Sequence, residues 1–429
     1  MNNTAHYTDM KDSGIKWIGM VPASWNVRTL YQLATRVNNK NFDLAEKNLL
    51  SLSYGKIKRK DINTNDGLLP ASFDGYNIIE GGDIVLRLTD LQNDHTSLRV
   101  GHATERGIIT SAYTTLRPIN PAHSRYLYYL IHAFDLKKGF YGMGSGVRQG
   151  LNYDEVKELR VVLPSQEEQN AIIAFLDKQC TQIDALIDEA KNSIDEYRRW
   201  RTSTIYWAVT KGIRSNVEMK PCPLEGVKSI PAHWDTRMIK YLASCNDEVL
   251  PETTDDEYFF NYIDIGSVKY GEGITQLQPM SFANAPSRAR RVVRKSDVIL
   301  STVRTYLKAV ALIGDFEEPE IVSTGFAVLR AFAINPLFLY YAVLSDNFIC
   351  KVEANSVGMS YPAINASEIM SFKIPLPPED EQSEIAEYLD RKCSIIADLI
   401  LEKNTLINDL EDFKRTLIYE TVTGKRKVV

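Results

Sequence analysis

The sequence has few cysteines and no long apolar run. Its cysteines are widely spaced, without a Cys-x-x-Cys pair or a neighbouring histidine cluster, at Cys180, Cys222, Cys245, Cys350 and Cys393. This pattern indicates neither a disulfide framework nor a zinc site. No stretch approaches the roughly 18 consecutive apolar residues of a membrane-spanning helix, and the first residues lack the apolar core of a secretion signal. We therefore expect a cytoplasmic protein without a bound metal.

Motifs of catalysis are also missing. The sequence has no Walker lysine motif, and the glycine-rich stretch 142–146 lacks the strand, helix and later acidic residue of a dinucleotide-binding turn. The turn that begins at Asn335-Pro336 resembles the Asn-Pro-Pro-Tyr turn of adenine methyltransferases, but its second proline is absent. The histidines are scattered, without metal-ligand or triad spacing. We therefore predict that this chain alone is not an enzyme.

The net charge is negative, which argues against binding of nucleic acid along the whole surface of the protein. The chain has 429 residues, 44% of them hydrophobic, which predicts several folding units with real cores, and its formal net charge is −5. Basic side chains nevertheless gather in 56–60 and in 281–310, where seven of them accompany a single acid, Asp297. Each stretch is either a local phosphate-binding patch or an ordinary solvated surface.

What the sequence does contain is an internal repeat with a period of about 210 residues, far longer than solenoid repeats. A Pro-x-x-Trp segment opens each copy, at Pro22 to Trp25 and at Pro231 to Trp234. Residues 151–210 align without a gap on residues 364–423, and both tails contain Leu-Pro-x-x-x-Glu-Gln. The repeat therefore consists of a domain followed by a connector.

The middles of the two copies match only in part. The run Asp83 to Leu86 returns as Asp297 to Leu300, a β-branched run that predicts a buried strand. The aromatic stretches that follow in both copies are more often core than ligand-binding groups. By contrast, residues 40–80 and 245–290 do not align, and the second of these stretches begins with many acids. Two copies of one scaffold thus carry two different inserts.

Each tail predicts one long helix of about 65 Å. Acids follow the prolines at each start, and no glycine appears before Gly212 and Gly424. In the second tail apolar residues alternate in steps of three and four, the spacing of a coiled-coil seam. The predicted seam residues are Ile183, Leu186, Ala190 and Tyr197 in the first helix, and Ile396, Leu399, Leu406, Leu410, Phe413 and Leu417 in the second. An amphipathic helix on a domain core is the simpler alternative.

The seam of the first helix is smaller and more polar than that of the second, which favours pairing of the two helices with each other. Because the chain passes through a whole domain between them, an antiparallel pair is the simplest geometry. The predicted fold is therefore α+β, with two repeated globular domains separated by two long helices in an antiparallel coiled coil. The predicted segments are 1–163, 164–212, 213–376 and 377–429.

The order of these parts, written twice, resembles the specificity subunit of type I restriction-modification systems over about residues 15–425. The resemblance implies two target recognition domains, each reading one half of a split DNA site, and helices that set the spacer and dock two methyltransferase subunits. It implies restriction subunits as further partners. S-adenosylmethionine, ATP and magnesium are then expected on those partners and not on this chain.

Under this resemblance the basic residues become candidate DNA contacts. In the first domain these are Lys56, Lys58, Arg59, Lys60, Arg148 and Gln149, and in the second Arg288, Arg290, Arg291 and Arg304. A different class of function, a two-domain coiled-coil adaptor that binds proteins and not DNA, stays open. A self-contained methyltransferase is disfavoured by the missing cofactor motif.

Overall fold

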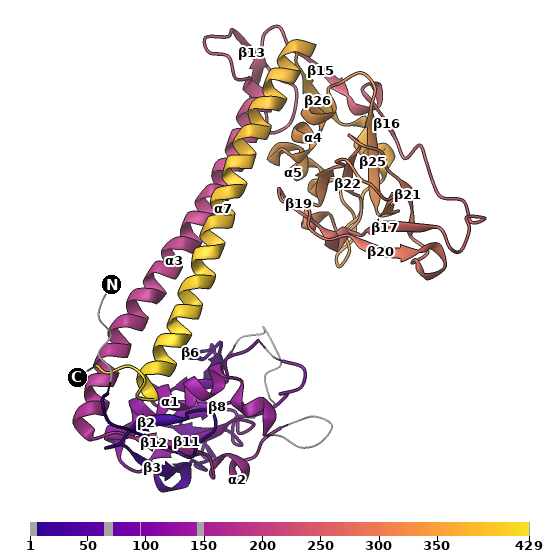
Figure 1. The fold of residues 1–429 in the computed structure, drawn as a ribbon. Helices are drawn as coiled ribbons and strands as arrows, with labels where there is room; N and C mark the ends of the chain where they lie inside the picture. Colours follow the sequence, from indigo (N-terminus) through magenta and orange to yellow (C-terminus); the bar gives the residue numbers. More distant parts are fainter. Residues whose placement is uncertain (1–6, 64–71, 95, 144–149, 429) are drawn as a thin grey trace. The chain divides into compact units, whose positions relative to one another are not determined.

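The computed structural model describes residues 7–63, 72–94, 96–143 and 150–428 (Figure 1). The chain forms two compact units. Unit 1 comprises residues 1–189 and 406–429, and unit 2 comprises residues 190–405. Each unit therefore contains one copy of the globular repeat and a part of each long helix.

The core of unit 1 is an antiparallel four-stranded sheet in the order β4-β11-β8-β9. Its strands are β4 (Ala34–Arg36), β11 (Thr114–Pro118), β8 (Ile84–Leu86) and β9 (Val100–His102), and helix α1 (Ser124–Leu136) packs against β9. All three side chains of β8 are fully buried. The buried strand predicted at this run is thus confirmed.

Unit 2 repeats this sheet with the same connectivity, in the order β16-β25-β22-β23. The strands are β16 (Ala243–Cys245), β25 (Phe326–Ala331), β22 (Val298–Ser301) and β23 (Val310–Leu312), and helix α4 (Pro336–Leu344) packs against β23. The sequence repeat is therefore a repeat of structure.

The segments that open and close each globular copy pair with each other. In unit 1 β3 (Asn26–Thr29) pairs with β12 (Arg160–Leu163), and in unit 2 β15 (Asp235–Met238) pairs with β26 (Lys373–Leu376). Hairpins precede them, formed by β1 (Met10–Asp12) with β2 (Met20–Pro22) and by β13 (Met219–Pro221) with β14 (Ser229–Pro231). The start of each copy thus lies beside the strand that leads into its long helix.

The inserts differ, as the failed alignment predicted. Unit 1 has two two-stranded pairs, β5 (Leu50–Ser53) with β6 (Lys56–Arg59) and β7 (Asn77–Ile79) with β10 (Gly107–Ile109). Unit 2 instead has a second four-stranded sheet, with β20 (Gln278–Ser281), β17 (Phe259–Ile263), β24 (Glu320–Ser323) and β21 (Ala289–Val292) in that order, and a small pair, β18 (Val268–Lys269) with β19 (Gly273–Ile274). Strands β17 and β24 are parallel, and β21 has a bulge at its start.

Short helices complete both units. They are η1 (Leu30–Gln32), η2 (Pro121–His123), η3 (Gly139–Gly142) and α2 (Tyr153–Val156) in unit 1, and η4 (Ile239–Tyr241), η5 (Ile265–Ser267), η6 (Phe282–Asn284), η7 (Thr305–Leu307), α5 (Asp346–Ala354) and α6 (Ala366–Ser371) in unit 2.

The repeated tryptophan and glutamate motifs bind each other. The indole N–H of Trp25 donates to Glu168 at 3.2 Å, and that of Trp234 donates to Glu381 at 3.0 Å. Both rings are buried, and a buried indole N–H usually has an acceptor. The two motifs therefore fix the opening segment of each copy to the start of its long helix.

A buried aspartate and an arginine on the neighbouring strand are also repeated. Arg117 forms a bidentate pair with Asp83 at 2.8 and 2.6 Å, and Arg330 does the same with Asp297 at 3.0 and 2.8 Å. Both carboxylates are only 2% exposed, and each also accepts a backbone N–H three residues before it. The matched sequence positions thus have a structural role.

The long helices are α3 (Gln166–Lys211) and α7 (Glu379–Val422), and they run antiparallel in each unit (Figure 1). In unit 1 the Tyr126 hydroxyl donates to the carbonyl of Val162, just before α3, and to that of Val422 at the end of α7, at 3.2 and 3.1 Å. In unit 2 Arg214, just after α3, pairs with Glu381 and Glu384 near the start of α7. The predicted α+β fold with an antiparallel helix pair is confirmed.

Seven of the ten predicted seam residues are buried or partly buried, and three are exposed. Ile183, Ala190, Ile396 and Leu417 are buried, and Tyr197, Leu399 and Leu410 are partly buried. Leu186, Leu406 and Phe413, however, are 50%, 42% and 51% exposed. The adjacent residues Ile187 and Ile407 are buried in place of Leu186 and Leu406, because the seam advances by four residues after Ile183, where we predicted three, and is shifted by one residue at Leu406 as well.

Candidate nucleic-acid interface

The first basic patch lies on strand β6 of unit 1. Lys56 and Lys58 are exposed, whereas Ile57 between them turns toward the core of the unit. This alternation follows from the two-residue period of a strand, and it places both lysines on one face. Lys60 continues the exposed stretch. Among the described residues no carboxylate forms an ion pair with these three lysines, so their charge is available to an anion.

Arg59 differs from its neighbours because it already has a partner. Its guanidinium binds both oxygens of Glu105, with Nε at 2.8 and 2.9 Å. The hydrogen bonds and the charge of Glu105 raise the pKa of Arg59. Arg59 therefore contributes less positive charge to this face than the sequence suggested. Arg148 and Gln149 lie outside the described residues.

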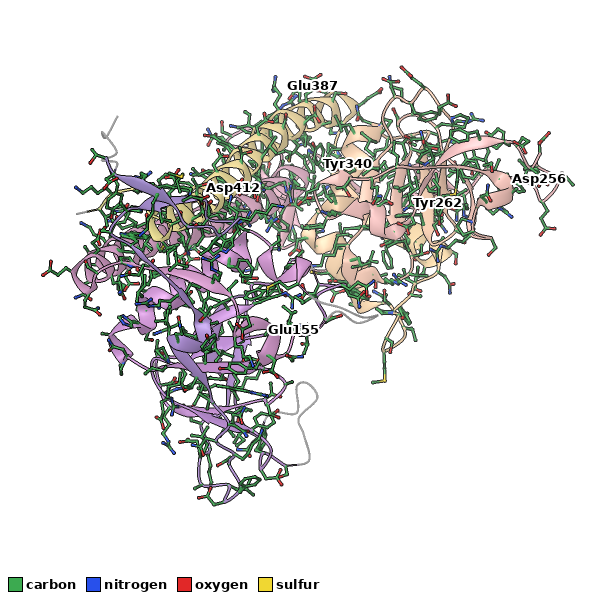
Figure 2. All side chains as sticks on the ribbon, turned by 60° about the horizontal axis from the view of Figure 1, so that its bottom comes forward. Glu155, Asp256, Tyr262, Tyr340, Glu387 and Asp412 are labelled. Carbon is green, nitrogen blue, oxygen red and sulfur yellow. The ribbon has the colours of Figure 1, made fainter. Side chains whose placement is uncertain are left out.

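The second basic patch lies around strand β21 of unit 2. Arg288 is exposed and donates to the hydroxyl of Tyr262 at 3.1 Å. Tyr262 belongs to β17 and is labelled in Figure 2. Arg290 donates to the carbonyl of Ala289 and lies 4.6 Å from the ring centre of Phe282. These contacts hold the two arginines in place, and Arg288 also forms a long ion pair with Asp264 at 3.9 Å.

Arg291 lines a separate cleft of about 360 Å³, together with Val303 and Val357. Its Nε is buried and has no hydrogen-bond partner among the described residues. A buried charged donor without a partner is costly, so this cleft suits an acceptor from outside the chain. Arg290 is the extra residue of the bulge in β21, whereas Arg291 pairs with Val322, so the two neighbouring arginines have different surroundings.

Arg304 lies near this cleft with its backbone in the left-handed region, at φ 52°. Lys308, at the other end of η7, has φ 51°. Left-handed backbone is unusual for residues with a side chain, and it clusters at functional sites. The Arg304 guanidinium lies 5.2 Å from the ring centre of the exposed Tyr361. The pair offers a positive charge and an aromatic face side by side.

The loop that carries Tyr361 was not predicted as a site. Val357, Met359 and Tyr361 are 81%, 103% and 66% exposed, and a bridge between Val357 and Ala363 closes the loop. The sequence repeat could have indicated this loop, because it aligns with the stretch that contains the predicted DNA contacts Arg148 and Gln149. The same stretch of the sequence repeat is thus a candidate in both copies.

The acidic stretch of unit 2 divides into two parts. Glu248 binds Arg330 at 2.7 Å and also pairs with Arg294, so it belongs to the framework. Asp255, Asp256 and Glu257 are exposed in the loop before β17, where Figure 2 labels Asp256. These exposed acids disfavour contact between that loop and a phosphate backbone.

Exposed apolar side chains also occur on the parts of the long helices that belong to each unit. In unit 1 these are Leu186, Leu406 and Phe413, and in unit 2 they are Trp200, Trp207, Ile395 and Leu401, each at least 42% exposed. Trp200 and Phe413 are equivalent positions of the repeat. Large exposed apolar groups of this kind mark surfaces for protein partners.

The four histidines within the described residues have structural surroundings. His123 contacts Gln169 at 2.8 Å, and His233 contacts Glu381 at 2.6 Å. Burial lowers the pKa of both His102 and His132 to about 4. No group of three or more metal-ligating side chains occurs in the described parts of the chain. Among the helices described, none is both long and apolar enough to cross a membrane.

The comparisons with known proteins agree on one family. The sequence profile of the type I restriction modification DNA specificity domain matches residues 22–196 and 233–411. The specificity subunit of the type I restriction enzyme MjaVIII of Methanocaldococcus jannaschii is 23% identical over 391 residues, which are 88% of this chain and 84% of that protein. The putative MjaX specificity subunit of the same organism is 24% identical over 442 residues and covers 96% of both chains.

A solved structure shares the fold. It comes from work on complex assembly and conformational transition of the type I R-M system, with a TM-score of 0.66 at 14% identity, and the match covers 94% of this chain and 98% of that one. The two family matches coincide with the two copies of the repeat. This chain therefore belongs to the family of type I restriction-modification specificity subunits.

Proposed function

We propose that this chain is the cytoplasmic DNA-reading subunit of a type I restriction-modification complex, and that each unit reads one half of a split, asymmetric site. One observation carries the proposal. Both units contain the same four-stranded sheet and the same fixed start of the long helix, yet they carry different inserts. A shared framework with different inserts is what we expect if both units bind DNA in the same way but read different base sequences.

The proposed contacts are basic residues of the two patches, of which Arg288 has a long ion pair with Asp264 at 3.9 Å. Lys56, Lys58 and Lys60 in unit 1 and Arg288, Arg290, Arg291 and Arg304 in unit 2 would mostly meet phosphates, as most protein–DNA hydrogen bonds do. Arg148 and Gln149 are the candidates for base reading, because both side chains can form bidentate contacts with bases. Arg59 is the weakest candidate, since Glu105 already binds it.

The long helices would set the spacer between the half-sites and dock two methyltransferase subunits. The antiparallel pairing and the exposed apolar residues of both helices support this part of the proposal. Restriction subunits would complete the complex. S-adenosylmethionine, ATP and magnesium would bind those partners, and the chemistry would take place there.

The negative net charge of the chain supports a further point. Phosphate neutralisation supplies most nucleic-acid affinity, so tight specific binding should require positive surfaces on the methyltransferase subunits. Binding of the same duplex by the chain alone and by the assembled complex, at physiological salt, tests this point. Equal affinities would contradict it.

Domain exchange tests the split site directly. Residues 1–163 are replaced by the corresponding segment of a related specificity subunit, and the methylated sites are then sequenced across a genome. We expect one half of the site to change and the other to stay. The matched exchange of residues 213–376 should change the opposite half. A change in both halves, or in neither, would reject the proposal, and the second outcome would favour a protein-binding adaptor.

A further inference from the structure

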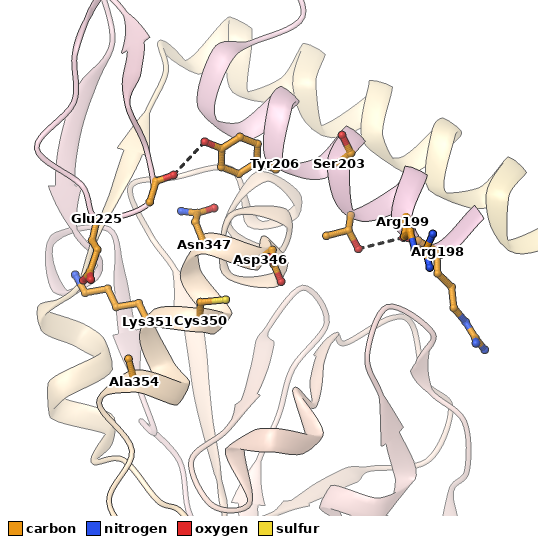
Figure 3. Close-up of a pocket in the computed structure, with 12 residues that line it drawn as sticks. Arg198, Arg199, Ser203, Tyr206, Glu225, Asp346, Asn347, Cys350, Lys351 and Ala354 are labelled. Carbon is orange, nitrogen blue, oxygen red and sulfur yellow. Dashed lines mark hydrogen bonds between the residues drawn. The ribbon is translucent and has the colours of Figure 1, made fainter. Parts of the chain in front are cut away.

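A pocket of about 720 Å³ lies in unit 2, between α3, α5 and the hairpin loop that joins β13 to β14 (Figure 3). Tyr206 and Arg199 of α3, Gly226 of the hairpin and Asn347 and Cys350 of α5 line it. This volume lies within the range of ordinary ligand pockets. None of the contacts proposed above with DNA uses these residues.

The repeat shows what fills the equivalent space in unit 1. Both hairpins have the same length, since Met10 pairs with Pro22 and Met219 pairs with Pro231, and this register aligns Trp17 with Gly226. The Tyr419 hydroxyl donates to the carbonyl of Trp17 at 2.9 Å. Tyr206 of α3 is the counterpart of Tyr419, and its hydroxyl donates to the carbonyl of Gly226 at 3.0 Å.

The indole of Trp17 therefore occupies in unit 1 the place that the missing side chain of Gly226 leaves in unit 2. Its ring centre lies 5.1 Å from that of Phe134 on α1 and 6.4 Å from that of Tyr419. In unit 2 a Cβ atom at Gly226 would lie 3.5 Å from the Cβ of Asn347. Helix α4 ends at Leu344, the counterpart of His132, and α5 begins at Asp346, the counterpart of Phe134, so no aromatic ring stands at that position in unit 2.

One polar atom of the pocket is left without a partner. The Oδ1 atom of Asn347 is buried and accepts no hydrogen bond among the described residues. Buried acceptors are normally satisfied, and an unsatisfied one indicates a missing donor. An indole supplies both an aromatic face and a single N–H donor.

The surface beside the pocket is suited to a protein. A second cleft, lined by Trp200, Trp207 and Tyr388, shares Ser203 with the pocket, and both tryptophans are about half exposed. Exposed aromatic residues next to a pocket are characteristic of protein interfaces, where one anchor side chain fills a hollow.

We propose that this pocket binds a tryptophan side chain of a partner polypeptide, in the place that Trp17 fills in unit 1. Indole binding by the pocket is independent of the function proposed above. The identity of the partner, which we take to be a methyltransferase subunit, rests on that function.

The chain provides its own reporter for the test. Cys350 lines the pocket and is the exposed one of the five cysteines, whereas Cys180 is buried and the others are partly buried. Alkylation of Cys350 in the full chain is followed with and without free indole. At an indole concentration ten times its Kd, we expect alkylation to slow roughly tenfold, because only the empty pocket reacts.

Two variants provide matched controls. Replacing residues 222–228 by the equally long sequence of residues 13–19, Ser-Gly-Ile-Lys-Trp-Ile-Gly, should fill the pocket and abolish indole binding. The reverse change, Trp17→Gly, should open the equivalent space in unit 1 and raise the number of bound indoles from about one to about two in equilibrium dialysis. If indole does not slow alkylation, or if the loop exchange leaves its binding unchanged, the pocket assignment is wrong.

The partner is tested in the assembled complex. Cys350 should become protected when methyltransferase subunits bind, and the loop exchange should weaken that assembly. Unchanged Cys350 reactivity in a complex that still methylates DNA would overturn the partner while leaving the proposed function intact. Failure of the complex to methylate a split site would count against the proposed function and not against the indole pocket.

Discussion

At the scale of single residues, the charged residues that recur in both copies of the repeat stabilise the central sheets and are not among the proposed DNA contacts. The bidentate pairs of Asp83 with Arg117 and of Asp297 with Arg330 join neighbouring strands of the two central sheets. Arg330 is 22% exposed and Arg117 is 43% exposed, so the pair in unit 2 is the better shielded from water. Removing one partner of a shielded pair leaves the other charge poorly solvated.

We therefore expect Asp297→Asn to lower the free energy of unfolding by about 2–3 kcal/mol. The substitution keeps the shape of the side chain but removes its charge from Arg330. Urea unfolding of the full chain measures the effect. Asp315→Asn is the control, because Asp315 pairs with Lys295 while 81% exposed and should contribute less than about 0.5 kcal/mol. Equal losses in the two variants would show that shielding does not matter here.

The two neighbouring cations of β6 should differ in their effect on DNA binding. Lys58 is exposed and unpaired in the described structure, whereas Arg59 is bound by Glu105. Lys58→Ala should reduce the slope of log K against log salt by about 0.9, the value for one released counterion. Arg59→Ala should change it less. Binding of the assembled complex to its site is measured between low and physiological salt, and a larger effect of Arg59 would reject the assignment.

Buried histidines should make unit 1 sensitive to acid. Burial lowers the pKa of His102 and His132 from 6.5 to about 4, with Arg125 and Lys414 among the nearby cations. The unfolded chain therefore binds more protons than the folded chain between pH 6.5 and 4, and stability falls as the pH falls through this window. Asp135 opposes this trend, because burial raises its pKa from 3.8 to about 6.

Two variants separate these contributions. His102→Gln should flatten the dependence of the unfolding midpoint on pH between 7 and 4.5, whereas Asp135→Asn should make it steeper. Each group contributes at most about 1.4 kcal/mol per pH unit. Thermal unfolding at several pH values provides the measurement, and changes of the same sign in both variants would contradict this account.

At the scale of elements, the position of the seam between α3 and α7 depends on which of two adjacent apolar residues is buried. Leu186 and Ile187 are adjacent, yet the first is 50% exposed and the second is 6% exposed. Both residues fit a spacing of three or four, so the heptad pattern alone could not choose between them. Because Ile187 is the buried residue, Leu186 is exposed and joins the apolar residues that we propose to contact partner proteins.

Ile187→Ala and Leu186→Ala should therefore have opposite consequences. The first should destabilise the chain by about 2–4 kcal/mol, because it leaves a cavity in a buried seam. The second should change the stability of the isolated chain little but weaken association with the methyltransferase subunits. Unfolding and subunit binding are measured for both variants. If Leu186→Ala is the more destabilising of the two, the seam is wrongly placed.

At the scale of the whole molecule, the helix pair is proposed as a spacer. Asp184 of α3 and Lys414 of α7 form an ion pair at 2.6 Å and so mark facing levels of the two helices. Inserting seven residues at both levels adds about 10.5 Å and keeps the heptad register. Because DNA rises about 3.4 Å per base pair, the unread spacer should grow by about three base pairs.

Both half-sites should stay unchanged in this variant, and genome-wide sequencing of methylated sites measures the spacer. As a control, the same heptad inserted in α3 alone disrupts the pairing and should reduce methylation without producing a new defined spacer. An active double insertion that keeps the original spacer would show that the helices do not set it.

The sequence by itself determined the repeat, the fold class, the long helices and the buried strand at Ile84–Leu86, because these depend on spacing and on periodicity along the chain. It also located the two tryptophan and glutamate motifs, although only the structure shows that they bind each other. The tertiary structure decided what depends on neighbours distant in sequence. Glu105 neutralises Arg59, the facing helix selects Ile187 over Leu186, and Gly226 leaves open the space that Trp17 fills in the other copy. Each of these outcomes is set by a partner side chain that no local pattern specifies.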